Sequence, residues 1–454
     1  MPLIAHASPD AVIAYRAGTP VLVSEFLADA QRLVRSFPAC THIINACSDR
    51  YHFTVGLAAA LASGRVSLLP SSQAPQMMHQ LGAFAPDAIC LTDEMDTSLA
   101  LPRLLYPRES LGANPDDAPA TAAMPAVPLV DATQLAAYVF TSGSTGTPLP
   151  YRKTLGPLLD CMREGARRLG LGGRKRWAIL ATVPPQHMYG FEMSVLLALA
   201  CGHALCAERP FYPADIAAAL ARLPRPRALI TTPVHLRALL GSGVEPPAVD
   251  LLVSSTAPLA QQLAAEAERS FDTRLLEIYG STETGQIAMR RPTHTAAWQL
   301  WSGVSLELEA DGSWARGGHI EQPTLLPDVL EMTGAESFLL HGRVSDLVNI
   351  AGKRSSLAYL NHQLNSIPGV EDGAFFHAAE PSGSHTGVAR VAACVVAPGL
   401  DAARLLAALR ERVDAVFLPR PLLFVARLPR NDTGKLPLAA LQSLAAHPNS
   451  ATPA

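Results

Sequence analysis

The stretch that decides the fold of this chain is Thr141-Ser142-Gly143-Ser144-Thr145-Gly146-Thr147, seven small residues of which five carry a hydroxyl group. It follows the apolar run Leu135–Phe140, which predicts a buried β-strand. Glycines let the backbone approach a ligand closely, and hydroxyl and exposed N–H groups donate hydrogen bonds to anions. The stretch therefore predicts either a phosphate-binding loop or a solvent-exposed turn, and the rest of the sequence decides between them.

The bulk composition is typical of a large folded protein. The chain has 454 residues, of which 49% are hydrophobic and 17% are charged, and this size predicts two or three domains. A net charge of −3 provides no basic field for nucleic acid or for an anionic membrane. We expect no membrane span and no signal peptide, because no run approaches about 20 apolar residues and the first residues lack the signal pattern.

Cysteine usage predicts a reducing, cytoplasmic environment. The seven cysteines are scattered through apolar segments, as expected of buried thiols rather than disulfides. Cys201 and Cys206 are close in sequence, but no second Cys or His pair at metal-binding spacing accompanies them. A metal–thiolate site is therefore not expected.

Runs typical of strands alternate with runs typical of helices, and this alternation predicts an α/β protein with helix-covered β-sheets. The predicted strands are Thr41–Cys47, Val66–Pro70, Leu135–Phe140, Arg176–Val183, His203–Ala207, Ala228–Thr232, Asp250–Ser255 and Arg274–Tyr279. The predicted helices are Phe53–Ser63, Phe191–Leu199, Ala214–Leu223, Val234–Leu240 and Leu259–Ser270.

The pattern changes after Ile287. Trp298–Trp314 predicts a β meander around Asp311-Gly312. From Gly342 onward, about 100 residues predict a small α+β domain with helices at Ala358–Ser366 and Asp401–Val416. We expect an N-terminal domain over residues 1–343, a C-terminal domain over 346–447 and a disordered tail over 448–454, with a surface loop at Pro107–Pro128.

Two further segments have the composition of binding loops. Tyr279-Gly280-Ser281-Thr282-Glu283-Thr284-Gly285 follows a predicted strand, and a carboxylate among hydroxyls and glycines can hold Mg²⁺ on phosphates. The alternative is a polar turn. The segment 184–191, PPQHMYGF, brings a histidine and two aromatic residues before a helix. It suits an apolar acyl or aryl pocket, although a lone histidine is more often structural.

Two charged segments frame the last domain. The sequence HGRVSD at 341–346 opens it, with Gly352-Lys353-Arg354 close behind, and LPRNDTGK at 428–435 ends it. Taken alone, each is typical of a solvated surface turn.

Taken in order, TSGSTGTP, YGSTETG, GRVSD and NDTGK resemble the adenylate-forming superfamily, which includes acyl- and aryl-CoA synthetases, peptide-synthetase adenylation domains and luciferases. The resemblance covers Tyr138 to Leu438 by motif, and the N-terminal part by its alternation of strands and helices. It implies ATP and Mg²⁺ as cofactors, and a C-terminal domain that acts as a mobile lid between two half-reactions.

The resemblance also implies a role for individual residues. Thr141 to Thr147 would bind the β- and γ-phosphates of ATP, and Tyr279, Gly280, Ser281 and Thr282 would lie along the adenylate. The family has an Asp 15 residues before the Arg of its GR pair, which is Asp328 here, so Asp328 and Arg343 would bind the ribose hydroxyls. Lys435 would bridge the substrate carboxylate and the α-phosphate.

The expected site is completed by three sets. The catalytic set is Lys435, Glu283, Thr282 and His187, with Glu283 as the metal ligand. The acid pocket would be formed by His187, Tyr189, Phe191, Thr256, Ala257, Gly280 and Gly285, and the thiol tunnel by Gly352 and Lys353.

The chain departs from the family pattern in three places. The phosphate loop ends in Pro148-Leu149-Pro150, where the family usually has Pro-Lys-Gly, and either Arg152 or Lys153 could supply the missing cation. Asp328 stands in Leu-Pro-Asp rather than Thr-Gly-Asp. Ser345 occupies the usual hinge position and Asp346 follows it, so the pivot residue stays open.

The resemblance implies a two-step ligase that forms an acyl-AMP and then a thioester. The chain is similar to the hydroxybenzoate-activating ligases of aryl polyene and xanthomonadin-type pigment pathways, which load an acyl carrier protein. The alternatives are an aryl- or fatty-acyl-CoA ligase that uses free CoA, and a catalytically silent nucleotide-binding homologue. The missing loop lysine leaves the silent homologue open, whereas Glu283 and Lys435 argue against it.

Overall fold

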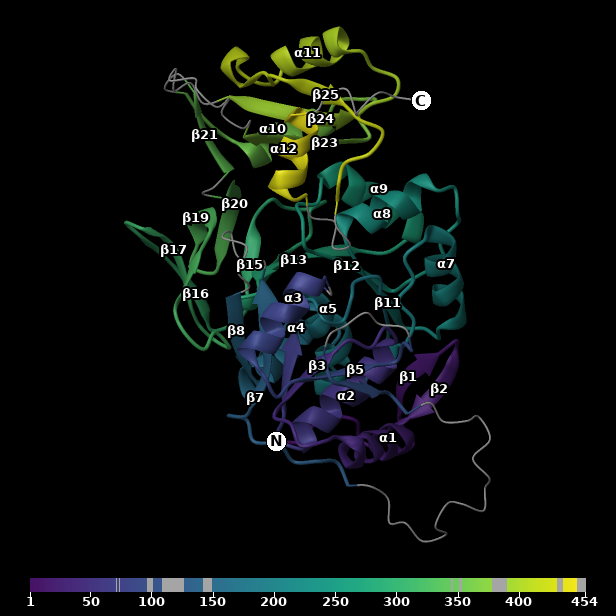
Figure 1. Ribbon diagram of the computed structural model, residues 1–454. Helices are drawn as coiled ribbons and strands as arrows, with labels where there is room; N and C mark the ends of the chain where they lie inside the picture. The colour runs from purple at the N-terminus through teal and green to yellow at the C-terminus, as the bar shows by residue number, and fades with distance from the viewer. Residues whose placement is uncertain are drawn as a thin grey trace. The chain divides into compact units, whose positions relative to one another are not determined.

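The computed structural model describes residues 1–70, 72, 74–95, 101–107, 126–141, 149–343, 346–350, 353–377, 390–430 and 436–446 (Figure 1). Two compact units divide the chain: the first is Met1–Thr295, Leu300–Ser305 and Arg316–Thr324, and the second is Ala296–Gln299, Leu306–Ala315 and Leu325–Ala454. The second unit therefore includes residues 325–343, which we had assigned to the N-terminal domain. The predicted functional boundary at 343–346 stays a prediction, and the tail 448–454 lies outside the described residues.

Two sheets with mainly parallel strands build the first unit. One has the order β6-β5-β3-β4-β7-β8, in which only β8 pairs antiparallel, with β7. Its strands are β3 (His42–Asn45), β4 (Val66–Leu69), β5 (Ile89–Thr92), β6 (Arg103–Leu105), β7 (Leu135–Thr141) and β8 (Leu149–Thr154).

The other sheet runs β14-β13-β12-β11-β9-β10-β1-β2 within this unit, with antiparallel pairs at its two ends and parallel pairs between them. Its strands are β1 (Val12–Arg16), β2 (Thr19–Leu22), β9 (Ala178–Ala181), β10 (Ala204–Cys206), β11 (Arg227–Thr231), β12 (Leu251–Ser254), β13 (Leu275–Ser281) and β14 (Gly285–Arg290).

Strand alternation sorts the side chains of this sheet into two hydrophobic clusters. Ile179 and Ala181 of β9 join the central core, whereas Ala178 and Leu180 pack with the apolar residues of α7, α8 and α9. The bounds of these helices are α7 (Pro213–Arg222), α8 (Pro233–Gly241) and α9 (Gln261–Phe271). The parallel strands β9, β11, β12 and β13 are therefore apolar on both faces, as expected of a parallel sheet covered by helices.

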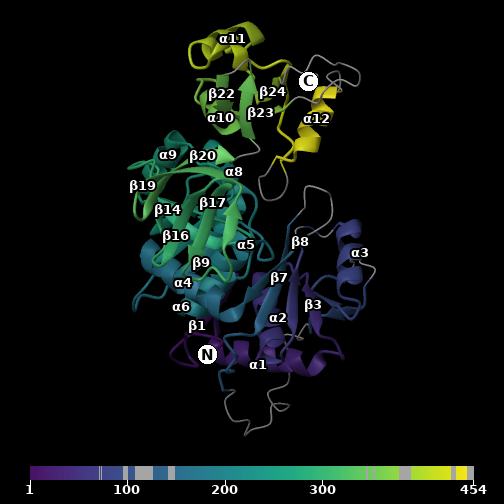
Figure 2. The ribbon, with the colours of Figure 1, turned by 90° about the vertical axis from the view of Figure 1, so that its left-hand side faces the viewer.

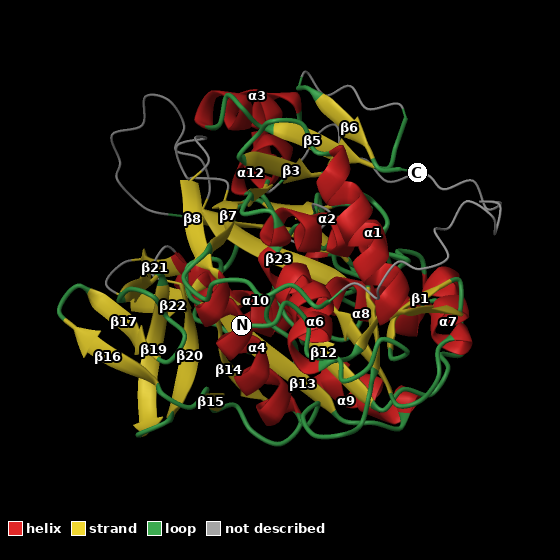
Figure 3. Cartoon of the chain, turned by 90° about the horizontal axis from the view of Figure 1, so that it is seen from below, coloured by secondary structure: helices red, strands yellow, loops and turns green. Residues whose placement is uncertain are grey.

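The central core lies between the two sheets and contains the helices α1 (Val23–Ser36), α2 (Arg50–Ala62) and α4 (Leu155–Leu169). Helices α1 and α2 run side by side (Figure 3). The outer face of the first sheet packs on α3 (Pro75–Phe84), which stands beside β7 and β3 in Figure 2. None of the described helices is both long and apolar enough to cross a membrane.

The second unit has a three-stranded sheet, β23-β24-β25, between two hydrophobic clusters. Its strands are β23 (Asp372–His377), β24 (Val391–Val396) and β25 (Leu422–Phe424), and its helices are α10 (Leu357–Asn365), α11 (Ala402–Arg410) and α12 (Leu438–Ala446). The predicted helix Asp401–Val416 was too long: α11 ends at Arg410, and a separate 3₁₀ turn, Ala415–Phe417, begins after Asp414. The side chain of Asp414 caps that turn and so competes with helix continuation.

Short hairpins precede this α+β part. The predicted meander around Asp311-Gly312 is confirmed, because β16 (Val304–Glu309) and β17 (Gly312–Gly317) meet there in the sheet β16-β17-β18, with β18 at Thr324–Leu326. Strand β20 (Ser337–Arg343) pairs antiparallel with β19 (Asp328–Gly334) and with β15 (Trp298–Leu300). The strands β21 (Leu347–Ile350) and β22 (Lys353–Ser356) form the last hairpin.

Candidate active site

The predicted site residues of the first unit lie where parallel strands end. The His187 segment follows β9, and Thr256 and Ala257 follow β12. Tyr279 and Gly280 are among the last three residues of β13. These strands belong to the consecutive series β13-β12-β11-β9, so their carboxyl ends share one edge. Ligands of open α/β sheets bind at this edge.

The centre of the candidate site is the turn at residues 281–285, here called the Glu283 turn. It joins the antiparallel strands β13 and β14. The backbone N–H of Ser281 donates to Thr284 Oγ1 at 3.2 Å, and the backbone N–H of Thr284 donates to Ser281 Oγ at 3.2 Å. These two hydroxyls close the turn, whereas Thr282 and Glu283 remain partly exposed.

Two side chains from distant segments hold consecutive carbonyl groups of this turn. Lys153 Nζ donates to the Glu283 carbonyl at 2.9 Å, and His319 Nε2 lies 3.1 Å from the Thr284 carbonyl. Burial lowers the pKa of His319 to about 4, so the ring is neutral near pH 7 and its Nε2–H donates to the carbonyl. The backbone of the turn is therefore fixed from the protein interior.

A buried carboxylate lies beneath the turn. Glu192 is 2% exposed, and burial raises its pKa to about 7. Cys161 Sγ donates to Glu192 Oε1 at 3.7 Å. Burial lowers the pKa of Lys153, and the charge of Glu192 opposes this effect. A Cβ atom on Gly285 would lie 2.7 Å from Glu192 Oε1, and Gly285 has φ +72°, so this position requires glycine.

Strand β8 links the phosphate-loop strand to the Glu283 turn. Tyr151 lies opposite Val139 of β7, two residues before the end of that strand at Thr141. Burial raises the pKa of Tyr151, the negative charge of the nearby Glu283 carboxylate raises it further, and the neighbouring Thr141 hydroxyl opposes these effects. Thr141, Tyr151 and Glu283 are therefore brought together, while Ser142, Gly143, Ser144, Thr145, Gly146 and Thr147 lie outside the described residues.

The two cations proposed to replace the loop lysine have different environments. Lys153 is 7% exposed and its ammonium group is bound to the Glu283 carbonyl, so it is not available to a phosphate loop. Arg152 lies on the opposite face of β8 and is exposed. Of the two, only Arg152 remains a candidate for phosphate binding.

The predicted acid-pocket segment is held by a buried arginine. Arg50 NH2 donates to the carbonyls of Ala181 and Val183 at 2.7 and 3.0 Å, just before the His187 loop. Burial lowers the pKa of Arg50 to about 10. A guanidinium group that makes these bonds fixes the path of the chain as it leaves β9.

The aromatic residues of this segment are packed inward. His187 precedes the short helix α5 (Met188–Gly190), which continues into a π-helical segment, Phe191–Leu196, and α6 (Leu197–Cys201). The Tyr189 hydroxyl donates to the Val253 carbonyl at 3.1 Å, and Phe191 is fully buried in the central core. The structure therefore gives Tyr189 and Phe191 packing contacts, and their part in an acid pocket stays a prediction.

The predicted pocket residues after β12 and in β13 have unusual backbone geometry. Thr256 has φ +81°, which a β-branched residue rarely adopts, and such strain is concentrated at functional sites. A Cβ atom on Gly280 would lie 2.2 Å from the Gly285 carbonyl oxygen, so no larger residue fits. Thr256, Ala257 and Gly280 retain exposed surface, as a ligand-facing edge requires.

In the second unit, the predicted ribose-binding pair is brought together by a hairpin. Asp328 and Arg343 lie directly opposite each other in the antiparallel pair β19·β20. Lys353, which we predicted for the thiol tunnel, is exposed on β22 and forms an ion pair with Asp414. Gly352, Ser345 and Lys435 lie outside the described residues, so their roles stay predictions.

The oxygen groups at the Glu283 turn fit Mg²⁺. This ion prefers oxygen ligands and is usually held by one or two carboxylates together with substrate phosphates. No group of three or more His, Cys, Asp or Glu side chains that could hold a metal occurs in the described part of the chain. Glu283 therefore fits as a ligand that shares the ion with ATP phosphates, rather than as part of an all-protein metal cage.

Comparison with known proteins identifies the family. The AMP-binding enzyme family matches residues 38–323, which is more than half of the chain. A 4-coumarate–CoA ligase from Rhodobacter capsulatus is 33% identical over 296 residues, which cover 65% of this chain and 73% of that protein. The chain belongs to the AMP-binding enzyme family.

Solved structures show the same fold. ATP-bound MatB from Rhodopseudomonas palustris matches with a TM-score of 0.81 and 19% identity, over 99% of this chain and 98% of that chain. The O-succinylbenzoate coenzyme A synthetase MenE from Bacillus subtilis, in complex with AMP, matches with a TM-score of 0.78 and 17% identity, over 96% of each chain. The predicted α/β fold is thereby confirmed.

Proposed function

We propose that this member of the AMP-binding enzyme family activates an aryl carboxylic acid of the hydroxybenzoate type with Mg·ATP, and then transfers the acyl group to a phosphopantetheine thiol. ATP-dependent activation of an acid by an enzyme of the CoA-ligase type follows from the family and from the ligase names of its relatives. The observation that carries the proposal is the placement of Thr141, at the start of the phosphate loop, and of Glu283 close to Tyr151 of strand β8.

The first half-reaction joins the acid to AMP. A carboxylate oxygen attacks the α-phosphorus, a new O–P bond forms, and the bond to pyrophosphate breaks. Thr141 and the loop that follows would bind the β- and γ-phosphates, and Glu283 would hold Mg²⁺, which neutralises phosphate charge when bound. Fixed cations and donors placed where charge develops are what such a reaction requires. Asp328 and Arg343 would bind the ribose, and Lys435 would contact the acid and the α-phosphate.

The second half-reaction forms the thioester. The thiol sulfur attacks the acyl carbon, the C–O bond to AMP breaks, and AMP leaves. We propose that the C-terminal domain rotates between the two steps, and that Gly352 and Lys353 then line the path of the phosphopantetheine arm. Motions of this kind commonly separate two reactions at one site.

Two acceptors carry this thiol. An acyl carrier protein is the acceptor that the pigment-pathway resemblance implies. Free CoA is the second candidate, and it is favoured by the name of the relative from Rhodobacter capsulatus, a 4-coumarate–CoA ligase. That name also supports a hydroxylated aromatic acid as the substrate class.

ATP–pyrophosphate exchange, measured over a panel of hydroxybenzoates, cinnamates and fatty acids, tests the proposal. We expect exchange that depends on an aryl acid and on Mg²⁺. Thioester formation is then measured with CoA and with a holo carrier protein. Absence of exchange with every acid would leave only the silent nucleotide-binding homologue, and a thioester formed with CoA alone would exclude the carrier protein.

Lys435→Ala separates the two half-reactions. We expect pyrophosphate exchange to fall about 10²–10³-fold, because a cation that stabilises transition-state charge is lost. Transfer from chemically prepared acyl-AMP to the thiol should continue at close to the wild-type rate. Equal loss of both reactions would contradict the role proposed for Lys435.

A further inference from the structure

We propose that Lys153 is a positioning residue for the metal-binding end of the site, because its ammonium group fixes the Glu283 carbonyl and so sets where the Glu283 carboxylate lies. This inference rests on the proposed function in one respect, the role of Glu283 toward Mg²⁺. It assigns to strand β8 a contribution that the motifs of the chain do not contain.

The first argument is that the turn does not need an ammonium group in order to form. Ser281 and Thr284 already close it with reciprocal hydrogen bonds, and the ladder between β13 and β14 begins directly at its ends, where Ser281 lies opposite Gly285. Burying a lysine is costly, and apolar residues commonly replace buried ion pairs without loss of stability. A lysine that is 7% exposed, with its ammonium group on one carbonyl, therefore points to a purpose beyond folding.

The second argument is that β8 contacts Glu283 at two points. Residues two apart in a strand face the same side, so Tyr151 and Lys153 both face the Glu283 turn. The Tyr151 hydroxyl lies close enough to the Glu283 carboxylate for that charge to add to burial in raising the pKa of Tyr151, and Lys153 donates to the Glu283 main-chain carbonyl at 2.9 Å. Strand β8 therefore fixes the backbone of Glu283 and faces its carboxylate, and groups that orient a metal ligand in this way govern metal affinity.

The third argument is that acidic side chains partly offset the cost of burying the ammonium group. Glu192, which is 2% exposed, and Glu321 both favour the charged form of Lys153. His319 holds the next carbonyl, that of Thr284, at 3.1 Å. Two consecutive carbonyls are thus fixed from below, and the Glu283 side chain is left on the outer side of the turn, where it is partly exposed.

The test compares Lys153→Met with the matched control Lys175→Met, an exposed lysine on the loop before β9. Calorimetric binding of α,β-methylene-ATP is measured in EDTA and at saturating Mg²⁺. Mg²⁺ should tighten analogue binding by the wild type and by the control. In Lys153→Met we expect this metal-dependent gain to fall about 10- to 100-fold, with binding in EDTA unchanged. Tyr151→Phe should lose a smaller part of the gain.

Two results would overturn the inference. In the first, Mg²⁺ tightens analogue binding by Lys153→Met as much as it does for the wild type. In the second, Lys153→Met loses the same affinity for the analogue with and without Mg²⁺, as a merely structural role would produce. If Lys153→Met does not fold, the double variant Lys153→Met/Glu192→Gln removes both buried charges. It must show the same selective loss, and a wild-type gain there contradicts the inference.

Kinetics separates this inference from the proposed function. In pyrophosphate exchange, we expect Lys153→Met to raise the half-saturating Mg²⁺ concentration more than it lowers kcat. A wild-type protein with no exchange activity would refute the ligase proposal, whereas the metal-dependent binding of the analogue would still test Lys153.

Discussion

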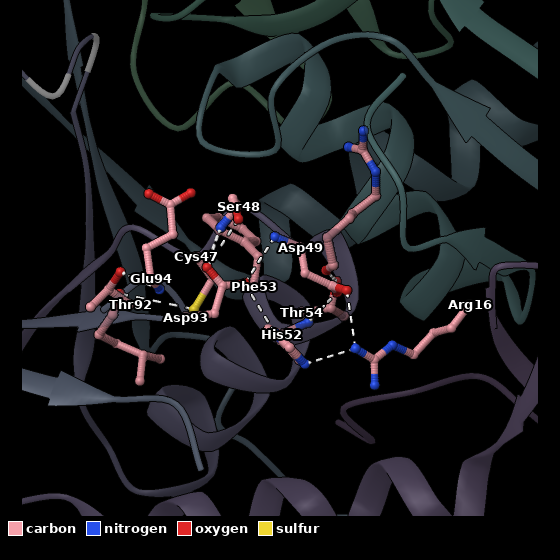
Figure 4. A network of polar contacts seen from close by, with 12 residues as sticks. Arg16, Cys47, Ser48, Asp49, His52, Phe53, Thr54, Thr92, Asp93 and Glu94 are labelled. Atoms are coloured by element: carbon pink, nitrogen blue, oxygen red, sulfur yellow. Dashed lines mark hydrogen bonds and ion pairs between the residues drawn. The ribbon is translucent and has the colours of Figure 1, made fainter. Parts of the chain in front are cut away.

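Two polar clusters of the first unit lie after parallel strands, and they use their carboxylates in different ways. In the cluster drawn in Figure 4, here called the Asp93 network, Asp93 follows β5. Its Oδ1 accepts from the Ser48 N–H at 2.8 Å and from Ser48 Oγ at 3.1 Å. Its Oδ2 accepts from the Asp49 N–H and from His52 Nδ1, both at 3.0 Å. Both carboxylate oxygens are fully used inside the protein.

The other residues of the Asp93 network also contact one another. Arg16 lies 3.1 Å from His52 Nε2, and because arginine can only donate, Nε2 must accept, which leaves the Nδ1 proton for Asp93. The His52 ring stacks on Tyr106 with ring centroids 4.0 Å apart, and Asp49 caps helix α2 by accepting from the His52 N–H at 3.0 Å. The network ties the start of α2 to the ends of β3 and β5.

The Glu283 turn is held through its backbone and not through its carboxylate. Its main-chain carbonyls are held by Lys153 and His319, and its carboxylate stands on the partly exposed side with Tyr151. A carboxylate that is saturated by internal donors stabilises the fold. A carboxylate that is fixed through its backbone is available to a ligand. Variants of the two clusters should therefore separate activity from stability.

The largest effect is expected for Glu283→Gln. Adenylation, measured by pyrophosphate exchange, should fall about 10²–10³-fold, because we propose that this carboxylate holds the Mg²⁺ that stabilises charge on the transferring phosphate group. The free energy of unfolding should change by less than about 1 kcal/mol, as is usual for a partly exposed side chain. A large loss of stability together with activity would show that the turn is a structural network like that of Asp93.

Asp93→Asn should give the opposite result. The amide cannot accept from all the donors around it, and each buried donor left unpaired costs about 1–3 kcal/mol. We expect the free energy of unfolding, measured in urea, to fall by that amount. The kcat/KM of the folded enzyme should stay within about twofold of wild type, and a selective loss of kcat would contradict the structural role.

The two clusters should lose stability in different pH ranges. The pKa of His319 is lowered by burial to about 4, so the stability that it contributes is present above about pH 6.5 and is lost as the pH falls toward 4. Burial alone would raise the pKa of Asp93, but the hydrogen bonds from His52, Ser48 and Asp49 lower it to about 2. Its contribution is therefore present above about pH 4 and is lost as the pH falls toward 2.

Urea unfolding as a function of pH checks these two ranges. Relative to wild type, His319→Gln should reduce the pH dependence between 6.5 and 4, and Asp93→Asn should reduce it below about pH 4. The comparison with wild type removes the contributions of His6 and His203, whose pKa values burial also lowers. Variants that change the same range would show that the two clusters are coupled.

The smallest effect is expected for Arg16→Met, at the edge of the Asp93 network. The Arg16 side chain is 44% exposed and lies 3.2 Å from Asp49, and exposed ion pairs of this kind contribute about 0–1 kcal/mol. Water can replace its donor at His52. Thermal unfolding should shift by only a few degrees, and a loss as large as that of Asp93→Asn would mean that Arg16 is an integral part of the network.

Much of the fold could be predicted from local pattern. The apolar runs of β11 and β12 and the polar turns that follow them gave strand positions to within one or two residues. The helices α1 and α4 were not assigned, although both are amphipathic with an apolar face in the core. The π-helical segment Phe191–Leu196 was also not predicted, because a hydrophobic run specifies a helix but not the register of its hydrogen bonds.

The candidate site was also predicted from the sequence only in part. The order and composition of the motifs predicted which residues face the substrates, and the spacing of Asp328 and Arg343 agrees with their pairing across β19 and β20. The sequence did not predict the bond of Lys153 to the Glu283 carbonyl, and Lys153 was one of two candidates, with Arg152, for the missing cation of the phosphate loop. The alternation of side chains along a strand places Lys153 and Tyr151 on one face of β8. The local sequence does not show that the Glu283 turn covers that face.

The sequence by itself determined the family, the α/β class and the chemistry of the loops, because composition and motif order are local properties of the chain. Only the tertiary structure decided which charges are buried and which are presented to a ligand. Lys153 meets a carbonyl 130 residues away, and His319 meets one 35 residues away. Which side chains are buried, and which distant groups they contact, depends on how sheets and helices pack. This packing saturates the Asp93 carboxylate with internal donors and leaves the Glu283 carboxylate partly exposed.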